Sequence, residues 1–183
     1  MAAAPLPVQE KLRRIDQQLK DSPTAFFSNA IEEELINDRV FAELYVLADV
    51  SPFDRTFVKQ RFGDYGLDLI HRMLDLKVLR LGTDGKMSLG QNRAAFSAKA
   101  IKKVGLQLVQ TYLKPERADE IYANHMALYF ENLSEKTYRQ WVDIDVQAFE
   151  DKMACLKEPG AKGSIPAFTF AIVETLKGPS EHE

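Results

Sequence analysis

The chain has 183 residues, of which 45% are hydrophobic and 28% are charged, and its formal net charge is −3. This composition excludes a fully disordered protein and allows one or two small domains with hydrophobic cores. No stretch approaches the roughly 20 apolar residues of a membrane-spanning helix. We expect no secretory signal, because the N-terminus lacks a continuous apolar segment. Cys155 is the only cysteine and cannot form an internal disulfide, so we predict a cytoplasmic protein.

The charges are unevenly distributed along the chain. Residues 51–117 carry 13 basic and 6 acidic side chains, a net charge of +7. Residues 1–50 carry 5 and 9, a net charge of −4, and residues 118–183 carry 6 and 12, a net charge of −6. A basic middle between acidic flanks is typical of a module that binds a polyanion, although uneven scatter of surface charge explains it equally well.

The first elements are predicted to be helices, and we assign residues 1–37 to an N-terminal helical arm. An amphipathic helix over residues 7–22 has an apolar stripe formed by Val8, Leu12, Ile15 and Leu19. Residues 25–50 predict one or two further helices, with a junction at Asn37 or Asp38, since either residue can cap a helix. The acidic run 32–34 has no further ligands at metal-binding spacing, so we interpret it as a solvated helix face.

Two helices and a β-hairpin are predicted over residues 51–89. Ser51 is the candidate N-cap of the first helix, and Gly63 is its expected end. The next helix, called the third helix below, is predicted over residues 65–76. Short strands at 78–81 and 87–89 flank an Asp84-Gly85 pair, which suits the positive φ angles of a type I′ turn.

The C-terminal half predicts a long helix followed by a β-α-β unit. The helix covers residues 93–113. Alternating apolar residues predict strands at 126–131 and 167–176, and a helix that Ser134 caps lies between them. Such a unit normally forms a right-handed crossover with parallel strands. Two strands alone make a marginal sheet, so the unit must find more strands, pack on neighbouring helices or pair with another copy of the chain. Of these, we predict that the chain forms a homodimer.

Residues 38–92 resemble a winged helix-turn-helix domain. The matching pieces are "NDRVFAELYVLADV", "SPFDRTFVKQRFG", "YGLDLIHRMLDLKVL" and the wing "VLRLGTDGKMSLG", which together cover roughly a third of the chain. The whole chain is similar to a group of bacterial proteins that join a winged helix to a C-terminal αβαβ module and are described as candidate transcriptional regulators. The resemblance implies an α+β, mainly helical fold: a winged-helix domain at 38–92, then a connecting helix and β-α-β module at 93–183. It also implies DNA as a partner.

The third helix does not have the charge expected of a DNA-reading helix. Asp68, His71, Arg72 and Asp75 fall within about 100° of one another on its circumference. Two carboxylates on that face repel phosphates, whereas DNA binding rewards net positive contacts. The opposite apolar arc spans roughly 180°, wider than a three-helix core needs, so the protein's own core or a partner must cover it.

Basic residues around the third helix are the candidate phosphate contacts. The predicted nucleic-acid-binding residues are Lys59, Arg61, His71, Arg72, Arg80, Lys86 and Arg93. They predict weak, salt-sensitive DNA binding with little sequence selectivity, and the alternative is that they only solubilise the surface. The first hypothesis is therefore a regulatory protein whose winged helix binds DNA and whose C-terminal module dimerises or receives a signal. A second hypothesis is a protein-interaction module on the same scaffold. The scattered histidines and Cys155 match no catalytic or metal-ligand spacing, so we expect no enzyme, metal or cofactor.

Overall fold

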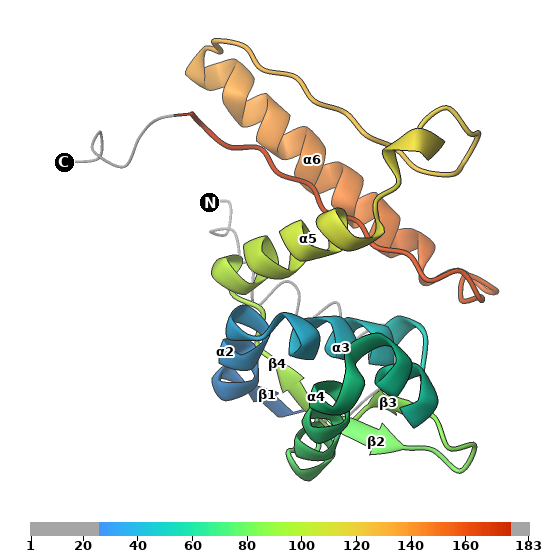
Figure 1. Ribbon diagram of the computed structural model, residues 1–183. Coiled ribbons are helices and arrows are strands. Elements are labelled where there is room, and N and C mark those ends of the chain that lie inside the picture. Colours follow the sequence, from blue (N-terminus) through green and yellow to red (C-terminus); the bar gives the residue numbers. More distant parts are fainter. Residues whose placement is uncertain (1–25, 177–183) are drawn as a thin grey trace. The chain divides into compact units, whose positions relative to one another are not determined.

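The computed structural model describes residues 26–176 (Figure 1). Its elements are β1 (Phe26–Ser28), α2 (Asn29–Asn37), α3 (Arg39–Val50), α4 (Arg55–Asp75), β2 (Leu79–Leu81), β3 (Met87–Leu89), β4 (Asn92–Ala94), α5 (Ala98–Tyr112), the 3-10 helix η1 (Pro115–Arg117) and α6 (Glu135–Cys155). The fold is α+β and mainly helical, as predicted. The helix predicted over residues 7–22 lies outside the described residues. Among those residues, no helix is long and apolar enough to cross a membrane.

The junction between α2 and α3 lies at Asp38, one of the two residues predicted there. Its Oδ1 accepts hydrogen bonds from the amides of Val40 (2.9 Å) and Phe41 (3.0 Å), which caps α3. The preceding residues 26–28 were predicted to be helical, but they form β1, which pairs in parallel with β4. This part of the predicted arm therefore belongs to the first folded unit, and α2 packs on α3 and α5. The helix predicted over residues 93–113 also starts later than predicted, because Arg93 and Ala94 belong to β4 and α5 begins at Ala98.

The acidic run on α2 is not wholly solvated, which corrects the interpretation from the sequence. Glu32 is buried, and its carboxylate accepts hydrogen bonds from the amide (2.9 Å) and the hydroxyl of Ser97. Ser97 also caps α5 through the amide of Ala100 (3.3 Å). Glu32 thus ties α2 to the start of α5, a contact across 65 residues that no local sequence pattern indicates.

Helix α4 consists of two helical halves that meet at Gly63. Gly63 has φ 64° and ψ −153°, a conformation that is essentially restricted to glycine. The two halves correspond to the two helices predicted on either side of it. The predicted N-cap Ser51 is wrong: Asp54 caps α4 by accepting from the amide of Phe57 (2.8 Å). Residues 51–54 cannot start the helix, because the backbone of Phe53 pairs with that of Met87.

The hairpin is confirmed as antiparallel strands β2 and β3. The predicted type I′ turn is wrong, because only Gly85 of the Asp84-Gly85 pair has a positive φ, at 77°. The amide of Gly85 donates to the carbonyl of Gly82 (3.1 Å), and Asp84 accepts a hydrogen bond from the amide of Lys86 (3.1 Å). The buried core lies between this hairpin and helices α2 to α5, and its largest fully buried side chains are Leu35, Phe41, Leu44, Val58, Ile70, Met73, Val78 and Met87. Ile70, Met73 and the buried Leu69 come from the wide apolar arc of the third helix, so the protein's own core covers most of that arc.

The chain divides into two compact units between Leu113 and Lys114. The prediction placed a domain boundary between residues 92 and 93 and grouped the following helix with the C-terminal module. In the structure that helix lies with the first unit, because α5 packs on α2 and α3 through buried Ala100 and Val104. The amide of Gln107 also donates to the carbonyl of Arg39 (2.7 Å). The amphipathic face of α5 therefore completes the first core.

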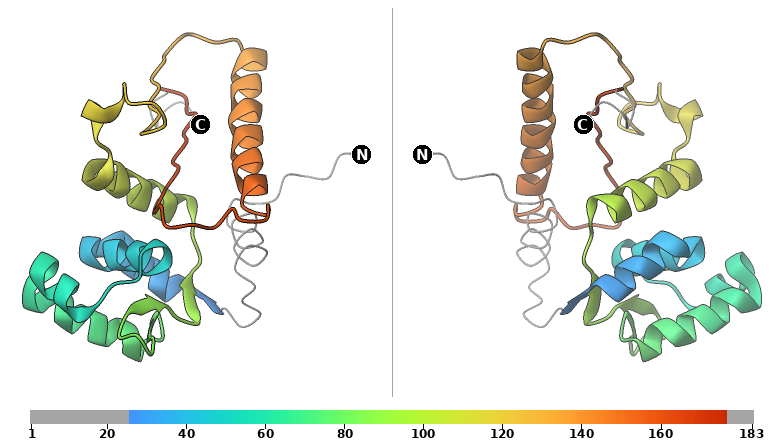
Figure 2. Two further views of the ribbon diagram at one scale, coloured as in Figure 1. Left: turned by 90° about the vertical axis from the view of Figure 1, so that its right-hand side faces the viewer. Right: turned by 90° about the vertical axis from the view of Figure 1, so that its left-hand side faces the viewer.

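The second unit contains η1, α6 and two extended segments. Ser134 caps α6 by accepting from the amide of Thr137 (3.2 Å), as predicted. The segments 126–131 and 167–176 were predicted to be strands, but neither pairs with another strand among the described residues. Figures 1 and 2 show both segments running alongside α6 in the direction opposite to it. The described residues have the order of a β-α-β unit: extended segment, helix, extended segment. They do not form a sheet, because neither extended backbone has a hydrogen-bonding neighbour among them.

Candidate nucleic-acid interface

The outward face of the third helix, which occupies residues 64–75 in the second half of α4, carries mixed charge. Asp68, His71, Arg72 and Asp75 are all exposed there. Ile70 and Met73 anchor the opposite side in the core, which fixes the orientation of this face. The side chains that the sequence placed on one face do lie on the exposed surface of the helix.

Arg72 is engaged by an acidic residue from α2. Its guanidinium donates to the carboxylate of Glu34, and both side chains are partly exposed. Close by, the hydroxyl of Tyr65 donates to Asp38, and this hydrogen bond is the main reason that the pKa of Tyr65 is raised above its ordinary value. The only arginine of the third helix therefore makes an ion pair within the molecule, and the positive potential at its face is reduced.

Arg61 is held by a buried carboxylate from α3. Its Nε (2.8 Å) and Nη2 (2.5 Å) both donate to Oε1 of Glu43, which also accepts from the hydroxyl of Tyr112 (2.7 Å). The guanidinium lies over the rings of Phe62 and Tyr112, at 5.5 and 5.9 Å from their centroids. The hydrogen bond to Glu43 raises the pKa of Arg61. Burial, with this carboxylate, raises the pKa of Tyr112 to about 12.

Arg93 is buried rather than exposed to a ligand. Only 8% of the residue is accessible, its Nε donates to the carbonyl of Gly90 (3.2 Å), and its Nη1 lies 3.8 Å from Asp49 of α3. Three of the seven predicted contact residues are therefore bound to carboxylates of α2 or α3. Sequence reasoning could not identify these pairs, because the partners lie far apart in the chain.

The other four predicted residues are exposed on α4 and the hairpin. Lys59 makes only a long ion pair with Asp64 (3.9 Å), and both side chains are highly exposed. Arg80 donates to the hydroxyl of Ser88 (3.0 Å), an uncharged acceptor on the neighbouring strand. Lys86 follows the hairpin turn. His71 lies 2.7 Å from the guanidinium of Arg55, and since arginine can only donate, the ring accepts through Nε2.

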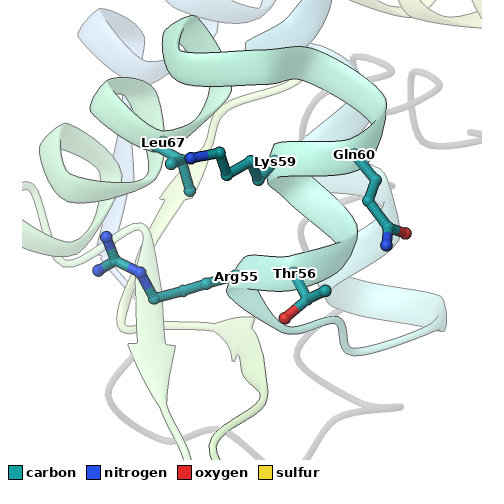
Figure 3. A pocket seen from close by; sticks show the side chains of 5 residues that line it. All are labelled: Arg55, Thr56, Lys59, Gln60 and Leu67. Carbon is teal, nitrogen blue, oxygen red and sulfur yellow. The ribbon is translucent and has the colours of Figure 1, made fainter.

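A surface depression of about 450 Å³ lies between the two halves of α4. It is lined by Arg55, Thr56, Lys59, Gln60 and Leu67 (Figure 3). In Figure 3, the Lys59 side chain extends toward Leu67, and Arg55 extends to the same side. The spacing of four residues between Arg55 and Lys59 could have identified this cationic helix face, but Arg55 was not among the seven predicted residues.

The described residues offer no alternative centre for metal chemistry. Within residues 26–176, no three His, Cys, Asp or Glu side chains gather closely enough to hold a metal ion. Cys155 is exposed near the end of α6. Comparison with protein-family models, with curated proteins and with solved structures finds no match to this chain.

Proposed function

We propose that residues 38–92 form a winged helix-turn-helix domain that binds DNA weakly and with little sequence selectivity, as part of a regulatory protein. The order of elements supports this fold: α3, the single bridge at Phe53, the two halves of α4, and the β2–β3 hairpin. In such a domain the third helix lies in the major groove and the hairpin contacts the backbone. The proposal for the fold rests on this order and on the kink at Gly63.

The observation that carries the DNA-binding proposal is a set of exposed cations that no carboxylate neutralises closely. Arg55 and Lys59 line the depression on α4, while Arg80 and Lys86 lie on the hairpin. Lys59, Arg80 and Lys86 are kept from the predicted set and Arg55 is added to them, while Arg61, Arg72 and Arg93 are left out because they are paired with acids inside the unit. Phosphate contacts determine affinity and position but carry no sequence information, and Asp68 and Asp75 oppose close contact of the third helix with bases.

The test is the salt dependence of binding, measured by fluorescence anisotropy on a labelled random-sequence duplex. Four phosphate contacts predict a slope of log K against log salt of roughly −3 to −4. Lys59→Gln and Lys86→Gln should each reduce the magnitude of the slope by about 1. Lys136→Gln on α6 is the matched control, since it removes the same charge from an exposed site in the second unit. No binding at low salt, or an equal loss for the control, would contradict the proposal.

The carboxylates of the third helix provide an independent test. Asp68→Asn and Asp75→Asn remove negative charge without changing side-chain size, so both should tighten binding if this face approaches the phosphates. Unchanged affinity would mean that the third helix does not face DNA.

A second candidate function is a protein-interaction module on the same scaffold. The pairing of Arg72 with Glu34 favours it, because it leaves the third helix with a mixed-charge face that suits a polar protein surface better than a phosphate backbone. A photo-crosslinking residue in place of His71 would distinguish the two functions. Crosslinks to protein but not to DNA support the second function, and the reverse result excludes it.

A further inference from the structure

The second unit exposes far more apolar surface than a stable small fold tolerates. Thirteen large apolar side chains between residues 114 and 176 are at least 40% exposed. Leu128 is 89% exposed, Phe130 is 76% exposed and Ile172 is 60% exposed. No described residue of this unit is buried, and α6 itself buries none. A surface of this kind marks a site of association.

The two extended segments also leave their backbones unpaired. Within residues 126–131 and 167–176, no amide or carbonyl makes a backbone hydrogen bond to another described residue. Such segments with alternating apolar side chains present an open edge that favours addition of another strand. The second unit therefore needs strands from another segment or chain to pair with its backbone, and apolar side chains to bury its exposed apolar surface.

The second unit contains one helix beside two extended segments, which is half of what a two-layer structure of helices on a sheet contains. Both extended segments run in the same direction alongside α6 (Figures 1 and 2). Tyr129 of the first segment contacts Trp141 of α6, with ring centroids 5.9 Å apart, and Lys152 of α6 donates to Thr169 of the second segment (3.1 Å). The helix thus contacts both segments and covers one side of them.

We propose that two copies of this chain dimerise through their second units, so that residues 126–131 and 167–176 of both copies form a shared four-stranded sheet covered by two α6 helices. An aromatic side chain buries roughly 150–250 Å², and the thirteen exposed side chains comprise four aromatic residues and nine smaller apolar ones. The exposed set therefore presents on the order of 1,000 Å² or more, which exceeds the roughly 800 Å² per partner of a standard stable interface.

Charge and chain composition favour a second copy over other occupants. Glu131 and Glu174 are the only charged side chains of the two segments, and each lies near the C-terminal end of its segment, so the rest of each segment can pair with a second copy without like-charge repulsion. The N-terminal residues 7–22 are predicted to form a helix with one narrow apolar stripe. A helix there would use its backbone amides and carbonyls for its own hydrogen bonds, so it could not pair with the extended segments. Its four apolar side chains would also be too few to cover the thirteen exposed apolar side chains of the second unit.

The first experiment measures the mass of the full-length chain by light scattering across a micromolar concentration series. The expected mass is twice the 20.8 kDa of one chain. Leu128→Asp combined with Phe130→Asp should halve the mass to that of the monomer, because both charges would be buried in the sheet. Leu81→Asp is the matched control, since Leu81 is 62% exposed on β2 in the first unit, and it should leave the dimer intact. A monomeric wild type, or a dimer that survives the double substitution, overturns the proposal.

The second experiment follows amide hydrogen exchange in the same proteins. The amides of residues 126–131 and 167–173 should be protected in the dimer, should lose protection on dilution, and should be unprotected in the double variant. Protection that does not depend on concentration, or that is lost in Leu12→Asp combined with Leu19→Asp, would place a segment of the same chain over the unit and overturn the proposal. The dimer does not depend on DNA binding, so either proposal can fail alone.

Discussion

At the scale of single residues, buried and half-buried carboxylates decide which arginines are available to a ligand. Glu34, Glu43 and Asp49 each lie opposite an arginine that the sequence offered as a phosphate contact. The sequence shows how many charges of each sign are present, but the pairs join residues 18, 38 and 44 positions apart. A helix-periodicity argument reaches only three or four positions, so it could not anticipate these pairs.

The Glu43 cluster provides the clearest stability prediction at this scale. Glu43→Ala removes the acceptor of three hydrogen bonds, from Arg61 twice and from Tyr112 once. The free energy of unfolding should fall by about 1–3 kcal/mol, measured by urea denaturation. The double variant with Arg61→Ala should lose less than the sum of the two single variants, because the cation that lacks a partner is then also absent. Strict additivity would show that the pair does not interact.

We expect the Tyr112 hydroxyl to lose its proton at a higher pH than an ordinary tyrosine. Its pKa is raised from 10.0 to about 12 in the folded protein, first by burial and then by the Glu43 carboxylate. The folded state therefore holds this proton more tightly than the unfolded state, so the associated stability is complete below pH 10 and is lost as the pH rises toward 12. A titration of tyrosinate absorbance should contain a late component that Tyr112→Phe removes. An unchanged titration in the variant would contradict the assignment.

At the scale of elements, local sequence signals predicted which helices, strands and turns exist better than they predicted where each one begins and ends. The hairpin, the Ser134 cap and the break at Gly63 depend on turn and capping chemistry that acts within a few residues, and the structure contains all three. Ser51 has an equally good residue type for an N-cap, but the prediction that it caps α4 was wrong. The bridge between Phe53 and Met87 keeps residues 51–53 extended, and a long-range backbone pair outweighs a capping preference of about 1 kcal/mol.

Gly63 should be hard to replace because of its backbone conformation. Its φ of 64° and ψ of −153° are strained for any residue with a Cβ atom, although an added Cβ would meet no atom within 4 Å. Gly63→Ala should lower the free energy of unfolding by about 1–3 kcal/mol through backbone strain alone. Gly163→Ala is the control: it too has open space, but its φ lies outside the left-handed region, so it should change stability little. Equal effects would exclude strain as the cause.

At the scale of the whole molecule, the two units differ in how they are stabilised. The first unit has a continuous buried cluster from α2 to α5, whereas the described part of the second has no buried side chain. If the second unit associates as proposed, association stabilises it and its folding depends on protein concentration.

Trp141, the only tryptophan, lies on α6 and reports on the second unit alone. If the proposed dimer forms, the thermal midpoint followed by tryptophan fluorescence should rise with protein concentration. The midpoint of the first unit, followed by hydrogen exchange of buried α3 amides, should not. In the Leu128→Asp and Phe130→Asp double variant, the fluorescence midpoint should lose its concentration dependence. A midpoint independent of concentration in the wild type would contradict the prediction.

The sequence by itself determined the helix content, the hairpin with its Asp84-Gly85 turn, the division of α4 at Gly63 and the exposure of Asp68 and Asp75. These follow from periodicity, capping and turn chemistry, which act between residues close in the chain. Only the tertiary structure decided that α5 belongs to the first core, that residues 26–28 pair with β4, and that Arg61, Arg72 and Arg93 contact carboxylates. Among residues 26–176, it also shows the two C-terminal segments without strand partners. Contacts of this kind join residues far apart in the chain, and local propensity contains no information about them.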